Sequence, residues 1–155
     1  MKKIILLLII GISLTACSNK NDCCVNIDTG ISVKYLNEGG ENLFEIDNGY
    51  NESDITIYHK INGEWNEYYE GNLDSPKGIT LVDSEDGKYI VIFPSTTFVG
   101  NNNSETKIEF SDSDSDIIKT EIDKSNSNTI VTKVWYNDVL EWEAYETERM
   151  FEIIK

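Results

Sequence analysis

The sequence predicts an all-β protein that folds as a single antiparallel β-sandwich of the immunoglobulin-like kind. The 155-residue chain suits one domain, and 39% of its residues are hydrophobic, which is enough for a compact core. Beyond residue 22, segments that alternate apolar and polar residues recur about every 8 to 14 residues, with turn residues between them. None of them keeps helical spacing over three turns. About eight or nine short strands in one domain are typical of a sandwich.

The first part of the domain is expected to contain a strand at residues 31–35 and a hairpin that begins with residues 55–61. Both segments alternate apolar and polar residues. Asn62-Gly63 tolerates the positive φ angles of a two-residue turn, and such a turn pairs Lys60 with Trp65. This register assigns to the core face Ile55, Ile57 and Tyr68.

A central strand is expected at residues 89–93, which are apolar at every position. This pattern predicts a strand covered on both faces, and Pro94 ends it. A loop over residues 72–78 and a short strand at 79–81 precede it. The remaining expected strands are residues 107–110, 118–122, 129–136, 139–145 and 150–154.

The first 17 residues have the layout of an export signal. Lys2 and Lys3 precede an apolar run over residues 4–12, which is shorter than the roughly 20 residues of a membrane-spanning helix. Leu14-Thr15-Ala16-Cys17 resembles the lipobox of bacterial lipoproteins, in which signal peptidase II cleaves before the cysteine and the cysteine carries the lipid. This resemblance implies three parts, which are a cleaved signal peptide (residues 1–16), a tether lipidated at Cys17 (17–24) and the β-sandwich domain (25–155).

The mature chain is also similar to small lipoproteins of Bacteroidota. The likeness rests on Cys23-Cys24, Ile27-Asp28, residues 73–76 and residues 133–137. It implies a lipid-anchored domain at the outer membrane, facing the periplasm or the cell surface, and it transfers no catalytic residue. Ser18 after the lipobox cysteine agrees with sorting to the outer membrane.

Cys23 and Cys24 are adjacent, and the sequence leaves their chemical state open. A disulfide between neighbours requires a strained ring, yet the bacterial envelope is oxidising. A vicinal disulfide, a mixed disulfide and two buried thiols are all compatible with the sequence.

The charge of the chain excludes nucleic acid as an expected partner. The formal net charge is -15, and binding to phosphate backbones needs clustered lysines and arginines. Removal of Lys2 and Lys3 with the signal peptide changes this value to -17. A domain this acidic is repelled by the anionic headgroups of membrane lipids. We therefore expect that the lipid on Cys17 alone holds it at the membrane.

Aromatic residues are the strongest indication of a binding function. A two-residue turn at Asn137-Asp138 would place Trp135 and Trp142 on one face with Val131, and Lys133 would stack on Trp142. Trp65 is expected on the exposed face of the first hairpin. Exposed rings of this kind can bind a glycan or a protein, and they can also simply stiffen the sheet.

A calcium site is a further hypothesis, because Asp112, Asp114 and Asp116 alternate with serines. The chain lacks the Gly and the bidentate Glu of an EF-hand, since Ile117 and Asp123 stand in those places. The alternative is a hydrated turn whose side chains cap their own backbone. No other cofactor is expected.

We therefore expect the protein to be a binding or structural module and not an enzyme. The alternative is a carbohydrate hydrolase that uses paired carboxylates, for which the candidates are Glu64, Glu67, Glu70 and Asp74. His59, the single histidine, is expected to be structural, because the chain has no G-x-S-x-G nucleophile motif.

Overall fold

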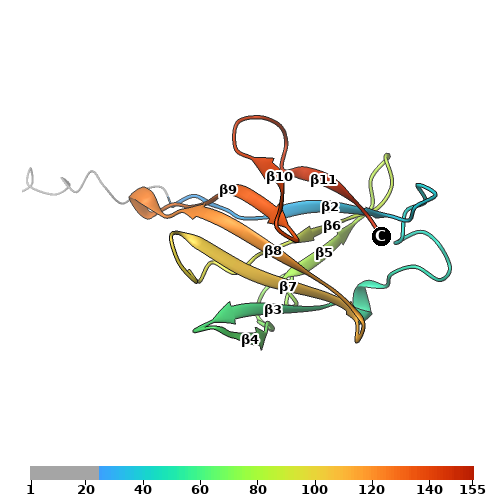
Figure 1. Ribbon diagram of the computed structural model, residues 1–155, viewed down its shortest axis with the longest axis horizontal. Helices are drawn as coiled ribbons and strands as arrows, with labels where there is room; N and C mark the ends of the chain where they lie inside the picture. The colour runs from blue at the N-terminus through green and yellow to red at the C-terminus, as the bar shows by residue number, and fades with distance from the viewer. Residues whose placement is uncertain (1–24) are drawn as a thin grey trace, which may run out of the picture.

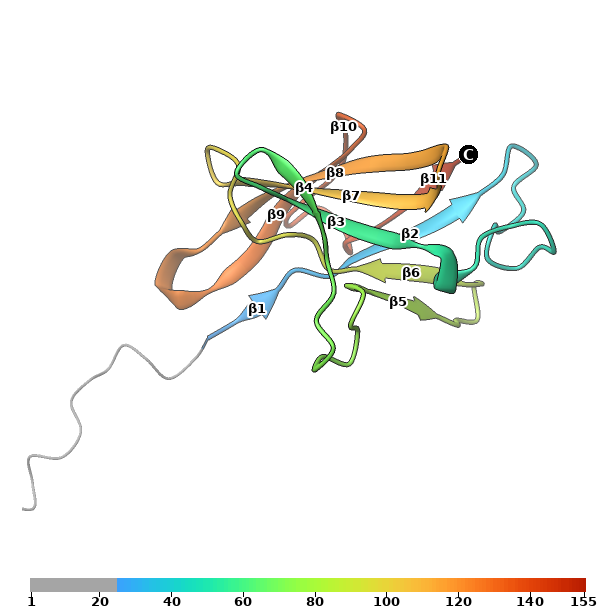
Figure 2. The ribbon, with the colours of Figure 1, turned by 90° about the horizontal axis from the view of Figure 1, so that it is seen from below.

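The structure, a computed structural model, describes residues 25–155 as two β-sheets packed face to face (Figures 1 and 2). The predicted signal peptide, Cys17, Cys23 and Cys24 lie outside the described residues. Figure 2 shows the two layers, with β7, β8 and β3 in one sheet and β2, β6 and β5 in the other. The predicted β-sandwich is confirmed.

The larger sheet, sheet A, has seven strands in the order β1-β9-β8-β7-β3-β4, and β10 also pairs with β9. The smaller sheet, sheet B, has four strands in the order β11-β2-β6-β5. The strands of sheet A are β1 (Ile27–Asp28), β3 (Thr56–Ile61), β4 (Glu64–Glu67), β7 (Asn103–Ser111), β8 (Asp114–Asp123), β9 (Thr129–Tyr136) and β10 (Val139–Glu143). Those of sheet B are β2 (Ile31–Leu36), β5 (Ile79–Val82), β6 (Tyr89–Ile92) and β11 (Met150–Ile154), and two short 3-10 helices are η1 (Glu52–Asp54) and η2 (Ser125–Ser127).

Pairing is antiparallel except in two places, where β1 runs parallel to β9 and β11 runs parallel to β2. Each parallel pair joins segments far apart in the sequence, so no hairpin turn forces their directions to oppose. Both sheets are therefore mixed, which the hairpin signals of the sequence do not indicate.

The core lies between the sheets and is filled mainly by β-branched residues. Inward positions alternate strictly along β7 and β8, where every second residue is buried. The fully buried side chains include Ile108, Ile118, Val131 and Val134 of sheet A and Ile31, Val33, Ile90 and Ile92 of sheet B. Such residues fit the pleated surface of a strand, because their branched side chains pack well on it.

Two of the predicted hairpins are confirmed with their turns. In β3–β4 the turn residues Asn62 and Gly63 have φ angles of 53° and 87°, and Lys60 pairs with Trp65 as predicted. In β9–β10 the turn residues Asn137 and Asp138 have φ angles of 47° and 67°. Two successive positive φ angles give the turn that matches the twist of a hairpin.

The prediction that the central strand is covered on both faces is wrong for its outer face. Ile90 and Ile92 of β6 point into the core and are fully buried, whereas Tyr89 and Val91 are only half-buried. Phe93, directly after β6, is 38% exposed. The described residues form only two layers, so the outward side chains of β6 lie at the surface.

Arg149, directly before β11, ties the two sheets together. Its guanidinium donates to the Asp28 carboxylate (2.9 Å) and to the backbone carbonyls of Gly30 (3.0 Å) and Val131 (3.2 Å). The guanidinium carbon also lies 4.6 Å from the centre of the Trp142 ring. One side chain thus joins the start of β11 to β1 and β9 of the opposite sheet.

We expect Arg149→Met to lower the free energy of unfolding by about 3 kcal/mol, because two backbone carbonyls lose their donor. Urea unfolding of the full chain measures this difference. Lys88→Met is the matched control, since the Lys88–Asp83 pair is exposed at 3.5 Å and should contribute about 0.5 kcal/mol or less. Equal losses in the two variants would contradict the role assigned to Arg149.

Candidate functional site

The three tryptophans proposed to bind a ligand do not lie on one face. Trp142 points into the core and is 7% exposed, whereas Trp65 is 36% exposed and Trp135 is half-buried on the outer face of sheet A. The prediction that Trp135 and Trp142 share a face is therefore wrong.

A β-bulge at Glu141 explains this difference. The pairing of β9 with β10 skips Glu141, so Trp142 stands opposite Val134 instead of Lys133. A separate bulge at Thr132, where the pairing of β8 with β9 shifts, places Val131 on the core side with Val134. An extra residue reverses which face the following residues occupy. The predicted Lys133–Trp142 stack is also wrong, because Lys133 pairs with Glu143 at 2.9 Å.

The remaining two tryptophans lie at the two ends of one cross-strand row on the outer face of sheet A. Successive members of the row are strand partners or, for Lys60 and Glu105, an ion pair at 2.6 Å. We call this set the tryptophan row, and its members are Trp65 (β4), Lys60 (β3), Glu105 (β7), Lys119 (β8) and Trp135 (β9).

A lysine holds each indole of the tryptophan row in place. The Lys60 ammonium lies 5.3 Å from the centre of the Trp65 ring, and the Lys119 ammonium lies 4.6 Å from the centre of the Trp135 ring. A cation over an aromatic face stabilises the pair by roughly 0.5–1 kcal/mol at an exposed site. Among residues 25–155, Lys119 has no carboxylate partner, so its N–H groups are available to a ligand.

The carboxylates proposed to bind calcium serve another purpose. Asp112 lies in the exposed turn between β7 and β8, whereas Asp114 and Asp116 lie on β8 itself. Lys155 donates to both of these strand carboxylates, with 2.6 Å to Asp114. Residues 25–155 contain no group of three His, Cys, Asp or Glu side chains that could hold a metal ion.

Aromatic hydroxyls complete the surroundings of the two strand carboxylates. Tyr136 donates to Asp116 at 2.5 Å, and Tyr50 donates to Asp114 at 2.6 Å. Burial alone would raise the pKa of Asp114. The hydrogen bonds from Lys155 and Tyr50 lower this pKa by more, so the net shift is downward. These contacts favour the anionic form of Asp114, and both aspartates bind Lys155 to sheet A.

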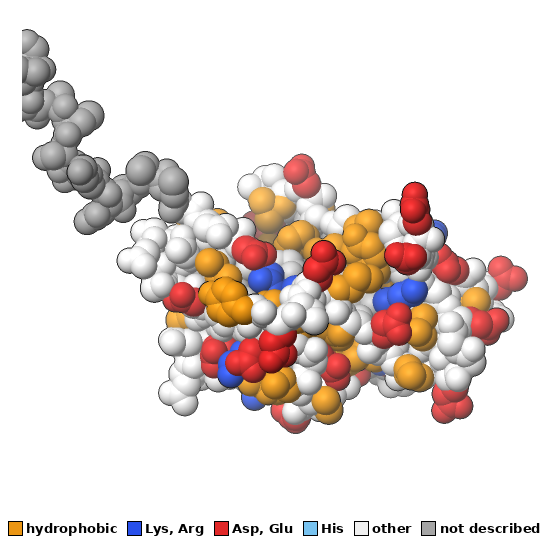
Figure 3. Space-filling view, turned by 90° about the horizontal axis from the view of Figure 1, so that it is seen from above, with side chains coloured by type: hydrophobic (Ala, Val, Ile, Leu, Met, Phe, Trp, Pro, Cys, Tyr) orange, Lys and Arg blue, Asp and Glu red, His pale blue; other side chains and the backbone are white. Residues whose placement is uncertain are grey.

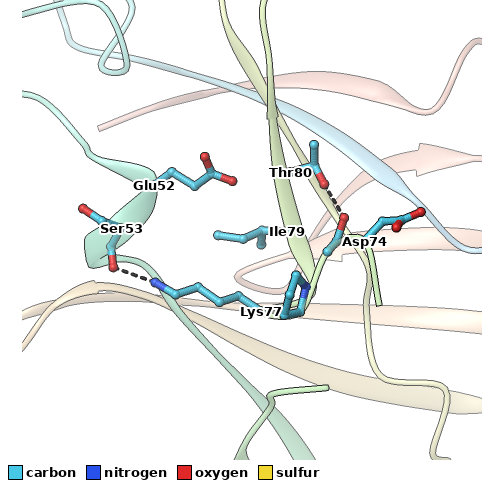
Figure 4. Close-up of a pocket in the computed structure, with 8 residues that line it drawn as sticks. Glu52, Ser53, Asp74, Lys77, Ile79 and Thr80 are labelled. Carbon is cyan, nitrogen blue, oxygen red and sulfur yellow. Dashed lines mark hydrogen bonds between the residues drawn. The ribbon is translucent and has the colours of Figure 1, made fainter. Parts of the chain in front are cut away.

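A polar pocket of about 360 Å³ lies where η1 meets β5 (Figure 4). Glu52 and Asp74 line it from opposite sides, and Ile79 lies between them. Lys77 donates to the Ser53 carbonyl at 2.6 Å. Of the four carboxylates considered for a hydrolase, only Asp74 lines this pocket, which is completed by Glu52, Ser53, Ser75, Pro76, Lys77, Ile79 and Thr80.

Glu52 is a site residue that the sequence does not reveal. It lies in an isolated 3-10 turn with no apolar periodicity around it. Glu64 and Glu67 lie on β4, all of whose residues are exposed. Glu52 and Asp74 reach one pocket only because η1 packs beside β5, which has no local sequence signal, and the Asp74 carboxylate points away from Glu52 (Figure 4).

A second, more apolar pocket of about 210 Å³ adjoins the first, with which it shares Asp74 and Ser75. Its apolar wall is formed by Tyr68, Leu73 and Phe93. The loop that contains Asp74 and Ser75 thus has the polar pocket on one side and the aromatic pocket on the other.

His59, which the sequence predicts to be structural, is half-buried on β3. Its ring stacks on Tyr68, with ring centres 4.2 Å apart and planes inclined by 26°. Its buried Nε2 has no hydrogen-bond partner within residues 25–155. Burial lowers the pKa of His59 from 6.5 to about 4, although a hydrogen bond to the backbone of Phe93 acts in the opposite direction.

Acidic side chains are spread over the face of the molecule shown in Figure 3, with hydrophobic side chains between them. Comparison of the chain with protein-family models, curated proteins and solved structures gives no match. In the described part of the chain, no helix has the length and hydrophobicity needed to cross a membrane.

Acid should weaken the fold through His59. Its folded pKa lies below the unfolded value, so the unfolded chain takes up a proton that the native chain does not. The contribution of neutral His59 to the free energy of unfolding should therefore be fully present above pH 6.5 and be lost as the pH falls towards 4. The loss should be about 2 kcal/mol once solvent screening of the half-buried ring is allowed for.

Urea unfolding of the full chain at a series of pH values measures this loss. His59→Phe is the matched variant, because it keeps the stack on Tyr68 and does not titrate. Its stability should change less between pH 6.5 and 5, and identical slopes for both proteins would contradict the assignment to His59.

Proposed function

We propose that this chain is a lipid-anchored protein of the outer membrane that binds a ligand through the outer face of sheet A. The observation that carries the binding function is the tryptophan row, which places two partly exposed indoles on one solvent-facing sheet surface. Large rings with a polar edge are enriched at binding surfaces, because they contribute much contact area at low entropic cost.

The anchor is inferred from the lipobox-like segment that ends at Cys17. Two or three acyl chains would give stable attachment, since each buried methylene contributes about 0.8 kcal/mol.

The expected result for the anchor is palmitate labelling of the wild-type chain and its recovery with membranes. Cys17→Ala should be unlabelled and released, because no other residue would carry the lipid. Cys23→Ala and Cys24→Ala are matched controls and should remain labelled. A soluble, unlabelled wild-type chain would overturn the proposal, and proteinase treatment of intact cells reports which side of the membrane the domain faces.

A carbohydrate hydrolase is the second candidate, and the presence of Glu52 and Asp74 among the residues that line one polar pocket favours it. Glycosidases use two carboxylates on opposite sides of the scissile bond. We expect polysaccharides incubated with the chain to release no new reducing ends, in keeping with a binding module. Release that is abolished in both Glu52→Gln and Asp74→Asn, but not in Glu64→Gln, would establish the hydrolase instead.

A further inference from the structure

We infer that the tryptophan row binds a linear, uncharged, β-1,4-linked polysaccharide, laid across the strands of sheet A. This inference rests on the proposed function and names its ligand class. The row crosses five neighbouring strands, β4, β3, β7, β8 and β9.

The length of the row fits an extended polymer. Four strand-to-strand steps separate the two tryptophans, and neighbouring strands lie about 4.8 Å apart, so the strands that carry the two indoles lie about 19 Å apart across the sheet. A single sugar or a short side chain cannot contact both rings. A flat, extended chain of several pyranose rings can, and Leu140, the partner of Trp135 on β10, lengthens its apolar path with a side chain that is 49% exposed.

The chemistry between the rings fits hydroxyl groups. Glu105 uses Oε2 to bind Lys60, and its Oε1 has no hydrogen-bond partner within residues 25–155. The Lys119 ammonium contacts only the Trp135 ring there. The middle of the row thus offers an acceptor and a donor, which is what sugar hydroxyls require, while the indoles at its ends can stack on the apolar faces of sugar rings.

Charge selects against ionic polymers. The chain carries -15 overall, so its field repels a polyanion at long range. A polycation would be repelled locally by Lys119, which has no carboxylate partner within residues 25–155, whereas Lys60 is already paired with Glu105. An uncharged polymer meets neither barrier. Equatorial hydroxyls and β-1,4 links give it the flat ribbon shape that an open sheet face accommodates.

The test is calorimetric titration of the purified full chain in detergent with two hexasaccharides, those of β-1,4-linked glucose and β-1,4-linked N-acetylglucosamine. One of them should bind about tenfold more tightly than its disaccharide, because only the longer chain reaches both indoles. Trp65→Ala and Trp135→Ala should each weaken hexasaccharide binding about tenfold and leave disaccharide binding less affected.

Tyr145→Ala is the matched control, since Tyr145 is a fully exposed aromatic residue in the loop after β10 and outside the row. It should bind like the wild type. Trp65→Phe and Trp135→Phe should retain most of the affinity, which separates loss of stacking from loss of folding. Absence of binding by both hexasaccharides, or equal binding by the Trp65→Ala chain, would overturn the inference.

A photo-crosslinking residue at position 117, which lies on the same face of β8 as Lys119 but outside the row, separates failure of this inference from failure of the proposed function when it is used on intact cells. Crosslinks to polysaccharide that are lost in Trp135→Ala support the inference. Crosslinks to a protein would overturn the ligand class and keep the binding face. No crosslink of either kind would overturn both the ligand class and the use of this face for binding.

Discussion

The attachment of the last strand across the sandwich is the constraint on which the rest of the fold depends. β11 has five residues and lies at the edge of sheet B, where it pairs only with β2. A cation stands at each end of it, and both cations bind groups of sheet A. Arg149 binds Asp28 and two backbone carbonyls, and Lys155 binds the two aspartates of β8. A short edge strand with one partner frays easily, and these two contacts make its loss cooperative with the loss of the core.

The attachment of β11 through Lys155 also determines which acidic side chains are free to bind a metal ion or a ligand. Asp114 and Asp116 alternate along β8 in a way that suggests metal binding, but Lys155 and the tyrosine hydroxyls already satisfy them. Burial of carboxylates requires partners of this kind, because an unpaired buried charge is strongly destabilising. The acidic hairpin is therefore a structural element, and the groups left open to solvent on the outer face of sheet A are the better candidates for recognition.

Local signals in the sequence predict most of the strands and both two-residue turns; they predict the whole register of β3–β4, and that of β9–β10 only as far as the bulge at Glu141. Asn62-Gly63 and Asn137-Asp138 succeed because a tight turn fixes register through a few dihedral angles of its own residues. The strands β7 and β8 extend further through the polar Asn and Asp/Ser segments than the sequence indicates, because tertiary pairing outweighs weak strand preference there. The parallel placement of β11 and the position of Lys155 depend on contacts between distant segments, which alternation of residues cannot encode.

The bulge at Glu141 gives the two tryptophans of one hairpin different roles. An unbroken β9–β10 ladder would place Trp135 and Trp142 on the same face, so that both would be buried or both exposed. With the bulge, Trp142 enters the core beneath Arg149, and Trp135 stays outside over Lys119. The inward ring therefore strengthens the attachment of β11, whereas the outward ring remains on a sheet face that nothing in the described chain covers. Because a bulge leaves a residue unpaired in the ladder, the bulge at Glu141, which lies between the two rings along the chain, is better explained by this division of roles than by stability alone.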